Sequence, residues 1–348
     1  MISLKTVFCH SSQNKTSKQF IGLRFVVLPL IAALCIFAFV SCRRDGERQY
    51  VIDVAMVFNA GTIEYYAVAY FQRLVQEGSD GRINVRLFPG AALGSEMDNV
   101  EQVRSGLVQM SIFGDVLTSQ LAAEYDVAVI PFAFPTYDDV AEAWAGPLGD
   151  LIQNALLERG NQFLVGIQKR GSRKLTASRP ITTPADLVGL RLRIPEVPSW
   201  VVVWGGLGTI PTPVTLAEVY TALQTGVVDA QENPVAMISM FRFFEVNRYI
   251  INTDHIHGKY RWSMNIDFFN SLPAEFQTLI LDSARIATEW GDQRLNEDER
   301  MLIEELVRHG VTFVDVDRQQ FVDAARPHLE QVAAGMAPLA REIIHQFF

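Results

Sequence analysis

Two arginines and a later acid–amide pair mark the part of the chain with the clearest chemical potential, the segment Gly189–Pro234. Arg191 and Arg193 lie near its start, Glu232 and Asn233 lie near its end, and the sequence between them is mostly apolar. A guanidinium group matches a carboxylate with two parallel hydrogen bonds, and an asparagine adds one donor and one acceptor group. This combination indicates a pocket for a small anion, with a salt-bridged core as the alternative.

A second group of basic residues, Lys169–Lys174, follows an expected strand. A basic run of this density is typical of a solvated surface. Arg193 lies instead in an otherwise apolar strand, where an unpaired charge is costly, so we expect it to have an anionic partner from the protein or from a ligand. Candidate apolar walls of the pocket, with core packing as the alternative, are Trp200, Trp204 and Trp262.

Motifs of enzymatic chemistry are scarce. The chain has no Gly-x-Ser-x-Gly elbow, no phosphate-binding loop and no dinucleotide fingerprint after its first strand. His255 and His257 form the only histidine pair, but no third ligand is evident, so we expect no metal site. Acidic pairs such as Asp138 and Asp139 suit helix starts and solvated faces. We expect no cofactor and no catalysis.

Size, composition and charge narrow the class of protein. The chain has 348 residues, of which 49% are apolar and 20% charged, so it is a folded protein large enough for two lobes. Its net charge of −9 argues against nucleic acid or an anionic membrane surface as a partner. An acidic ligand remains compatible with this charge, because a pocket can be locally positive on a negative protein.

The N-terminus is typical of an export signal. A basic lead is followed by the apolar run Phe25–Val40 and then by Ser41 and Cys42. The run is short for a membrane span of about 20 residues, although an uncleaved anchor helix is the alternative. Cys42 stands where a bacterial lipoprotein signal has its acylated cysteine, and Phe39 replaces the usual leucine of that signal. The remaining chain has no cysteine, so the folded part has neither a disulfide framework nor a thiolate zinc site.

Strands and helices alternate through the rest of the chain, which predicts βαβ units and an α/β fold class. Helices are expected where a serine or threonine precedes an acidic residue by three positions, at Ser95, Thr136, Thr183 and Thr215. After Pro234 the sequence predicts mostly helix, including a long one from Ala274 to about Glu305 and a last one from Gln319 onward. Strands are expected at Tyr50–Phe58, Arg82–Phe88, Val108–Phe113, Val127–Ile130, Phe163–Ile167, Leu190–Ile194, Val227–Ala230, Tyr260–Asp267 and Val311–Val316.

Eight short stretches, in order and correctly spaced, give the chain a close resemblance to the solute-binding proteins of tripartite ATP-independent periplasmic (TRAP) transporters, the dicarboxylate-binding-protein family. Each stretch is weak alone, but together they are highly specific and cover nearly the whole chain after the signal. They are Gly81–Pro89, Leu93–Glu96, Pro131–Phe134, Gly189–Glu196, Pro211–Pro213, Glu218–Gln224, Gly226–Pro234 and Phe244–Val246.

The resemblance implies a two-lobe fold of the periplasmic-binding-protein type II class, with long helices spanning both lobes and closure by hinge motion. It implies a lipoprotein signal peptide at 1–41 and a tether at 42–49. The first lobe would comprise 50–170 and 257–298, and the second 171–256 and 299–348.

The same resemblance implies roles for particular residues. Arg193 corresponds to the family's carboxylate-binding arginine, Arg173 to a second ligand-binding arginine, and Asn233 to the ligand-binding asparagine, whereas Arg191 has only a generic basic position. Two departures are Val57-Phe58, where the family often has Ala-His, and Ala230, where it usually has glycine. Further ligand-wall positions would be Asn59, Glu96, Asp115, Glu196, Trp200, Leu216 and Glu232.

We therefore expect an extracytoplasmic, lipid-anchored, monomeric binding protein that delivers a small organic acid to a TRAP permease driven by an ion gradient. A dicarboxylate or a sugar acid such as a hexuronate is the expected ligand class. One alternative is a sensor subunit that signals to a membrane kinase. Another is a secreted lyase or glycosidase that uses Asp115 or Glu232 as an acid or base.

Overall fold

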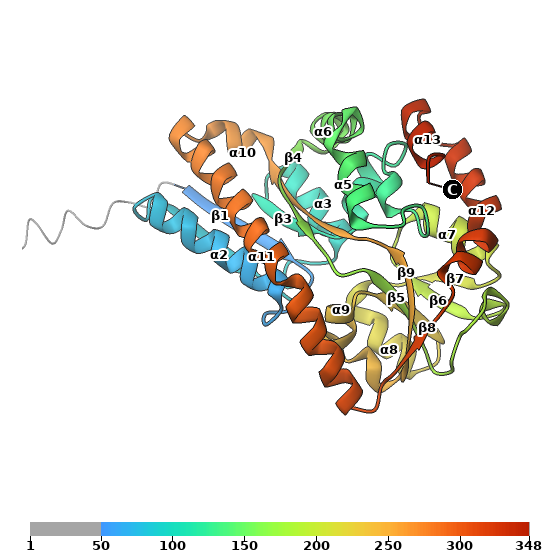
Figure 1. The fold of residues 1–348 in the computed structure, drawn as a ribbon. Helices are drawn as coiled ribbons and strands as arrows, with labels where there is room; N and C mark the ends of the chain where they lie inside the picture. Colours follow the sequence, from blue (N-terminus) through green and yellow to red (C-terminus); the bar gives the residue numbers. More distant parts are fainter. Residues whose placement is uncertain (1–49, 348) are drawn as a thin grey trace, which may run out of the picture. The chain divides into compact units, whose positions relative to one another are not determined.

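Two mixed β-sheets organise the chain (Figure 1). The computed structural model describes residues 50–347, so the expected signal peptide, Cys42 and the tether lie outside the described residues. Within 50–347, no helix is both long enough and apolar enough to cross a membrane. The predicted α/β class is confirmed.

The first sheet has the strand order β2-β1-β3-β10-β4. Strands β1, β2 and β3 run parallel to one another, and β10 is antiparallel to both of its neighbours. The strands are β1 (Tyr50–Met56), β2 (Ile83–Phe88), β3 (Met110–Phe113), β4 (Gln162–Lys169) and β10 (Lys259–Asn265).

The second sheet has the strand order β11-β9-β5-β8-β6-β7. Its strands β6, β7 and β8 are parallel, and β5 is antiparallel to β8 and β9. The strands are β5 (Arg173–Ala177), β6 (Arg191–Ile194), β7 (Ile210–Pro213), β8 (Ala230–Asn233), β9 (Tyr249–Ile256) and β11 (Thr312–Asp315).

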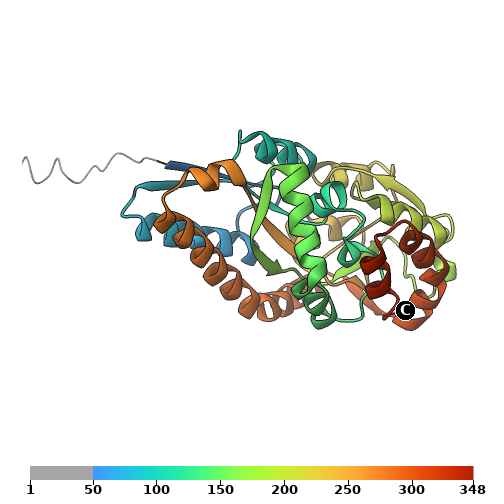
Figure 2. The same ribbon diagram turned by 90° about the horizontal axis from the view of Figure 1, so that it is seen from above.

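Helices cover both sheets, and one of them passes between the two parts of the chain. The 35-residue helix α11 (Ala274–Arg308) packs against α2 and β4 of the first sheet and against α9, which follows β8 of the second (Figures 1 and 2). The other helices are α2 (Ile63–Gly78), α3 (Glu96–Ser105), α4 (Val116–Leu121), α5 (Tyr137–Ala145), α6 (Pro147–Gly160), α7 (Pro198–Gly206), α8 (Val219–Gln224), α9 (Val235–Met240), α10 (Ile266–Ser271), α12 (Arg318–Ala334) and α13 (Pro338–Ile344).

The chain passes from one sheet to the other through short connections. Residues 170–172 join β4 to β5, residues 257–258 join β9 back to β10, and α11 leads to β11. In Figure 1 the first two of these passages lie in the middle of the described part, where β4, β5, β9 and β10 approach each other, whereas α11 turns into β11 at the bottom of the picture. Short connections of this kind place the side chains of residues 170–173 beside both sheets.

Several expected elements differ from the structure. The predicted strand Val127–Ile130 is wrong: the segment is a buried 3-10 turn, Val127–Val129, because a short apolar run does not distinguish a strand from a buried turn. The strand expected at Val227–Ala230 is instead Ala230–Asn233, three residues later, so its polar residues lie inside the sheet. The predicted strands also omit β5, β9 and β7, and the two prolines of β7 fit an edge strand.

Some expected helices are shorter than predicted. The Thr183 and Thr215 starts lead only to 3-10 turns at Pro184–Leu187 and Leu216–Glu218, the second continuing directly into α8. The last helix is divided into α12 and α13 at residues 335–337. The helix expected at Val235–Val246 ends at Met240, and Arg242 then adopts a left-handed conformation with φ 58°.

Close packing of α11 gives a test of the fold. A Cβ atom at Gly291 would lie 2.3 Å from Gln168 Nε2 and 3.2 Å from Ala67 Cβ. Gln168 is itself buried, so it has little room to move. We expect Gly291→Ala to lower the free energy of unfolding by about 1–3 kcal/mol, although alanine favours a helix interior by about 1 kcal/mol. Urea denaturation measures this change.

Gly146→Ala is the control for that variant, because its Cβ would meet no atom within 4 Å and its φ is −102°. Its free energy of unfolding should change by less than about 0.5 kcal/mol. Equal effects of the two substitutions would contradict the close packing of α11.

Candidate ligand-binding site

A pocket of about 340 Å³ lies between the two sheets, at the carboxyl ends of parallel strands from both. This edge is where open α/β sheets bind ligands, because the loops that follow the strands converge there. The first-sheet part of the chain contributes Val57, Ala91, Gly94, Ser95, Glu96, Met97, Asp115, Val116, Arg170 and Tyr260. The second-sheet part contributes Arg173, Arg193, Pro195, Glu196, Val214, Thr215, Leu216, Ala217, Glu218, Asn233 and Met237.

Arg193 is the cation that the protein leaves uncompensated. It lies on β6 with 3% of its surface exposed, and its Nε donates to the Val214 carbonyl oxygen at 2.8 Å. Within residues 50–347 no carboxylate lies within ion-pairing distance of its guanidinium, and its terminal nitrogens have no hydrogen-bond partner. Burial lowers the pKa of Arg193 to about 10, so the side chain is still charged at neutral pH. The Arg193 guanidinium thus keeps its charge and two free donor nitrogens, which suit an anion.

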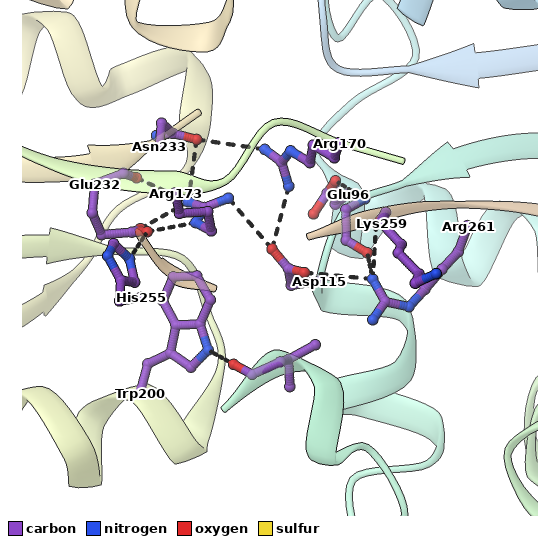
Figure 3. Close-up of polar contacts among 12 residues, drawn as sticks. Glu96, Asp115, Arg170, Arg173, Trp200, Glu232, Asn233, His255, Lys259 and Arg261 are labelled. Atoms are coloured by element: carbon purple, nitrogen blue, oxygen red, sulfur yellow. Dashed lines mark hydrogen bonds and ion pairs between the residues drawn. The ribbon is translucent and has the colours of Figure 1, made fainter. Parts of the chain in front are cut away.

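Arg173 is held in place by the protein itself (Figure 3). Its Nε and Nη2 bind the two carboxylate oxygens of Glu232 at 2.5 and 2.8 Å, and its guanidinium lies 4.9 Å from the centre of a Trp200 ring. Glu232 is fully buried and also contacts His255 Nε2 at 3.1 Å. Burial acts to raise the pKa of Glu232, but Arg173 and His255 outweigh this effect and hold it below its usual range.

Arg170 is a pocket residue that the sequence did not reveal. Its Nη1 lies 3.2 Å from Asp115 Oδ2, its Nη2 lies 3.5 Å from Asn233 Oδ1, and its guanidinium covers the Tyr260 ring at 4.9 Å. The expectation of a solvated surface for Lys169–Lys174 is wrong, because the run joins the two sheets and its Arg170, Arg173 and Lys174 are buried. The sequence signal that could have predicted the burial of Arg170 is its position three residues before Arg173, where one strand ends and the next begins.

Asp115 connects the arginines from both sheets. Its carboxylate lies 3.2 Å from Arg170, 3.4 Å from Arg173 and 3.4 Å from Arg261 (Figure 3). It precedes α4 but makes no side-chain cap on that helix. Its charge is therefore used to offset the buried guanidinium groups.

Asn233 occupies the junction of the two compensated arginines. Its Oδ1 accepts from Arg173 Nη2 at 3.2 Å and from Arg170 Nη2 at 3.5 Å, and its Nδ2 donates to Gln231 Oε1 at 2.7 Å. These contacts fix the orientation of the amide and assign its oxygen to the arginine side.

Glu96 lines the opposite wall, at the start of α3. Its Oε1 accepts a hydrogen bond from the Gly114 amide at 2.7 Å. Burial raises the pKa of Glu96, and the hydrogen bond and the nearby Arg170 partly oppose this shift. Glu196 and Leu216, also expected in the wall, line the pocket as well.

Three of the expected wall residues lie outside the pocket lining. Glu232 and Trp200 lie behind Arg173 and are completely buried, and Asn59 is exposed, with its backbone amide 3.0 Å from Met240 Sδ. Glu232 and Trp200 contact Arg173 from the side away from the pocket. Trp204 and Trp262 lie in the hydrophobic core and not in this wall.

The histidine pair has a structural explanation. His255 lies between Thr253 Oγ1 at 2.8 Å and Glu232, and burial lowers its pKa, so the ring is neutral at physiological pH. In the described range 50–347, no group of three or more histidine, cysteine, aspartate or glutamate side chains is arranged to hold a metal ion.

Fold and site together define a binding protein. Two helix-covered β-sheets enclose a pocket, and its wall holds Arg193, a buried cation without a counter-charge in the described residues. Residues 54–335 match the family described as bacterial extracellular solute-binding protein, family 7, and the chain belongs to this family. The predicted family is thereby confirmed, and with it the expected function of a solute-binding protein of the TRAP class.

Individual relatives agree with this assignment. A solute-binding protein of Roseobacter denitrificans is 32% identical over 322 residues, which cover 92% of this chain and 97% of the relative. The 2,3-diketo-L-gulonate-binding periplasmic protein of Escherichia coli is 31% identical over 75% of this chain and 80% of its own.

Solved structures confirm the predicted two-lobe fold type. A TRAP periplasmic solute-binding protein from Roseobacter denitrificans with bound L-galactonate matches with a TM-score of 0.81 and 32% identity, over 86% of this chain and 99% of that chain. One from Sulfitobacter with bound β-D-galacturonate matches with a TM-score of 0.80 and 26% identity, over 85% of this chain and 99% of that chain.

The buried pair of Arg173 and Glu232 leads to a stability prediction. Glu232→Gln leaves Arg173 without its main counter-charge and should lower the free energy of unfolding at pH 7 by about 3–5 kcal/mol, as measured by urea denaturation. Because the folded-state pKa of Glu232 is depressed, its contribution is complete above the unfolded pKa of about 4.3 and is lost as the pH falls through the folded value. The difference between wild type and variant should therefore shrink at acidic pH.

The exposed Glu142, which has no ion pair within residues 50–347, provides the charge-matched control. Glu142→Gln should leave the free energy of unfolding nearly unchanged at every pH. A Glu232→Gln deficit that stays constant down to pH 3 would contradict the charged pair.

Proposed function

We propose that the protein captures a six-carbon sugar acid, an aldonate or uronate, by its carboxylate. The observation that carries the proposal is Arg193, a buried guanidinium in a pocket wall with no counter-charge in the described chain. A carboxylate that enters the pocket meets the two terminal nitrogens of the buried Arg193, and a charge-assisted pair is strong away from bulk water. Arg173, Arg170 and Asn233 form the rest of the polar wall around it.

Relatives support this ligand class. The structures described above hold L-galactonate and β-D-galacturonate, and another TRAP periplasmic solute-binding protein, from Pseudomonas putida, holds D-glucuronate. All three ligands join one carboxylate to a chain or ring of hydroxyl groups. The pocket of this protein offers acceptors for such hydroxyls in Glu96, Thr215 and Glu218.

Two lobes that close over the ligand would be built around the two sheets. We assign 50–170 and 257–298 to the first lobe and 171–256 and 299–348 to the second. The pocket takes its walls from both sets of residues, and the boundary at 298 falls inside α11, which would then belong to both lobes.

Delivery to a TRAP permease follows from the family, whose members bind small organic acids and work with TRAP permeases. We propose that the protein acts by binding alone, without catalysis, and as a monomer. The suggested acid–base residues support this view: Glu232 lies outside the pocket lining and is bound by Arg173, and Asp115 is shared by three arginines.

Anchoring at a membrane through Cys42 is part of the proposal, with the folded part in the periplasm. The signal-like sequence before Cys42 carries this inference. Cys42→Ser should abolish incorporation of radiolabelled palmitate by cells expressing the full chain, because the acceptor sulfur is lost. Labelling of Cys42→Ser equal to wild type would contradict the lipid anchor, and Cys9→Ser, near the start of the expected signal peptide, provides the matched control.

Arg193→Met tests the ligand assignment while keeping an unbranched side chain. Truncating one partner of a buried charge pair costs about 2–5 kcal/mol of binding free energy, so we expect this loss in calorimetric titrations with L-galactonate, D-galacturonate and D-glucuronate. The ligand-free variant should be at least as stable as wild type in urea, because it no longer buries an unpaired charge.

Arg191→Met is the matched control on the same strand. Arg191 is exposed and paired with Asp229, away from the pocket. Its replacement should leave the affinity unchanged. Unaltered affinity in Arg193→Met would refute the assignment of Arg193.

A further inference from the structure

The pocket wall carries more carboxylates than arginines. Its arginines are Arg170, Arg173 and Arg193, and its acidic residues are Glu96, Asp115, Glu196 and Glu218. Two of the arginines already have counter-charges. Arg173 has Glu232 behind it, and Arg170 has Asp115 at 3.2 Å, since Arg261, which also contacts Asp115, has Asp126 at 3.7 Å. Arg193 is left as the single uncompensated cation of the lining, so the wall provides for one negative charge on a ligand.

The remaining three acidic residues have no ion-pair partner among the described residues, although the charge of Arg170 acts on Glu96. Glu96, Glu196 and Glu218 form no ion pair within residues 50–347. Glu96 accepts one hydrogen bond from the Gly114 amide, and Glu218 accepts one from Thr215 Oγ1 at 2.7 Å. An ionised carboxylate has about four acceptor sites, so these groups retain free acceptors for hydroxyl donors and would repel a second carboxylate.

Of these three carboxylates, Glu96 has the strongest electrostatic effect on a ligand in the pocket. It is partly buried and faces the pocket from the first-sheet side, whereas Arg193 faces it from the second. A ligand held by Arg193 therefore extends toward Glu96. Glu196 and Glu218 are exposed at the pocket mouth, where water and salt weaken their fields.

We infer that the pocket selects its ligand by charge: it accepts a hydroxylated monocarboxylate and rejects the dicarboxylate of the same carbon skeleton, with Glu96 as the main determinant. This inference rests on the proposed function, in which Arg193 holds the carboxylate of a sugar acid. It distinguishes aldonates and uronates from aldarates. An aldarate differs from the matching aldonate only in the oxidation of one terminal carbon, and from the matching uronate also in being an open chain.

Two pairs of acids test the inference, because the members of each pair share stereochemistry and length. They are L-galactonate with galactarate, and D-gluconate with D-glucarate, and all four are open-chain acids. Isothermal titration at pH 7.5 gives the affinity ratio within each pair. We expect the wild type to bind the monocarboxylate at least about tenfold more tightly, because a like charge facing Glu96 costs binding free energy, of which 1.4 kcal/mol corresponds to tenfold.

Single substitutions test which carboxylate causes the difference in affinity between the two acids of a pair. Glu96→Gln keeps the shape and the Gly114 hydrogen bond but removes the charge, so the affinity ratio should fall by about tenfold. Glu218→Gln, at an exposed position, should lower the ratio less and provides a second test should Glu96→Gln fold poorly. Glu142→Gln, outside the pocket, should leave the ratio unchanged.

The outcomes separate this inference from the proposed function. Equal affinities within both pairs for the wild type would overturn charge selection while leaving the sugar-acid function intact. A ratio that Glu96→Gln and Glu218→Gln both leave unchanged would overturn the role of the carboxylates. Failure of the wild type to bind either member of either pair would refute the proposed function, and the inference with it.

Discussion

Burying several guanidinium groups beside one another requires counter-charges, and this requirement shapes the centre of the protein. Asp115 lies among Arg170, Arg173 and Arg261, and Glu232 binds Arg173 with both carboxylate oxygens. A buried ion pair contributes little net stability, because desolvation offsets most of its Coulomb energy. Its value here is positional: the compensated arginines form a rigid polar wall, next to which Arg193 is left with a full charge and free donors.

The topology explains why these groups meet. Asp115 follows β3 of the first sheet, and Glu232 and Asn233 lie on β8 of the second. Arg170 lies in the passage between the sheets, and Arg173 is the first residue after it. Each residue is close to its neighbours in space but distant from most of them in sequence. The connection 170–172 is short, so a small rotation between the sheets would move Arg170 and Arg173 relative to Asp115. The ion-pair distances to Asp115 would change with it.

The sequence predicted the fold class, the long helix α11 and the position of Arg193 and Asn233 in a pocket, because these depend on local periodicity or on specific ordered motifs. It misplaced β8, since the polar residues Gln231–Asn233 look like the end of a strand when their partners on β5 are unknown. Arg170 was assigned to the surface for the same reason: its burial depends on Asp115 and Tyr260, which lie far away in the chain. The local sequence pattern cannot show that the charge of an arginine is offset by residues that only the tertiary fold brings near it.

The continuity of α11 has a mechanical consequence. The helix packs on α2 and β4, and near its C-terminal end Leu306 joins a hydrophobic cluster with Val219 and Ile250. Any change in the angle between the sheets must therefore bend one hydrogen-bonded rod, in addition to turning the loops at 170–172 and 257–258. Because α11 is held by packed side chains on both parts of the chain, the two sheets cannot change their relative angle without bending the helix or loosening one of these contacts.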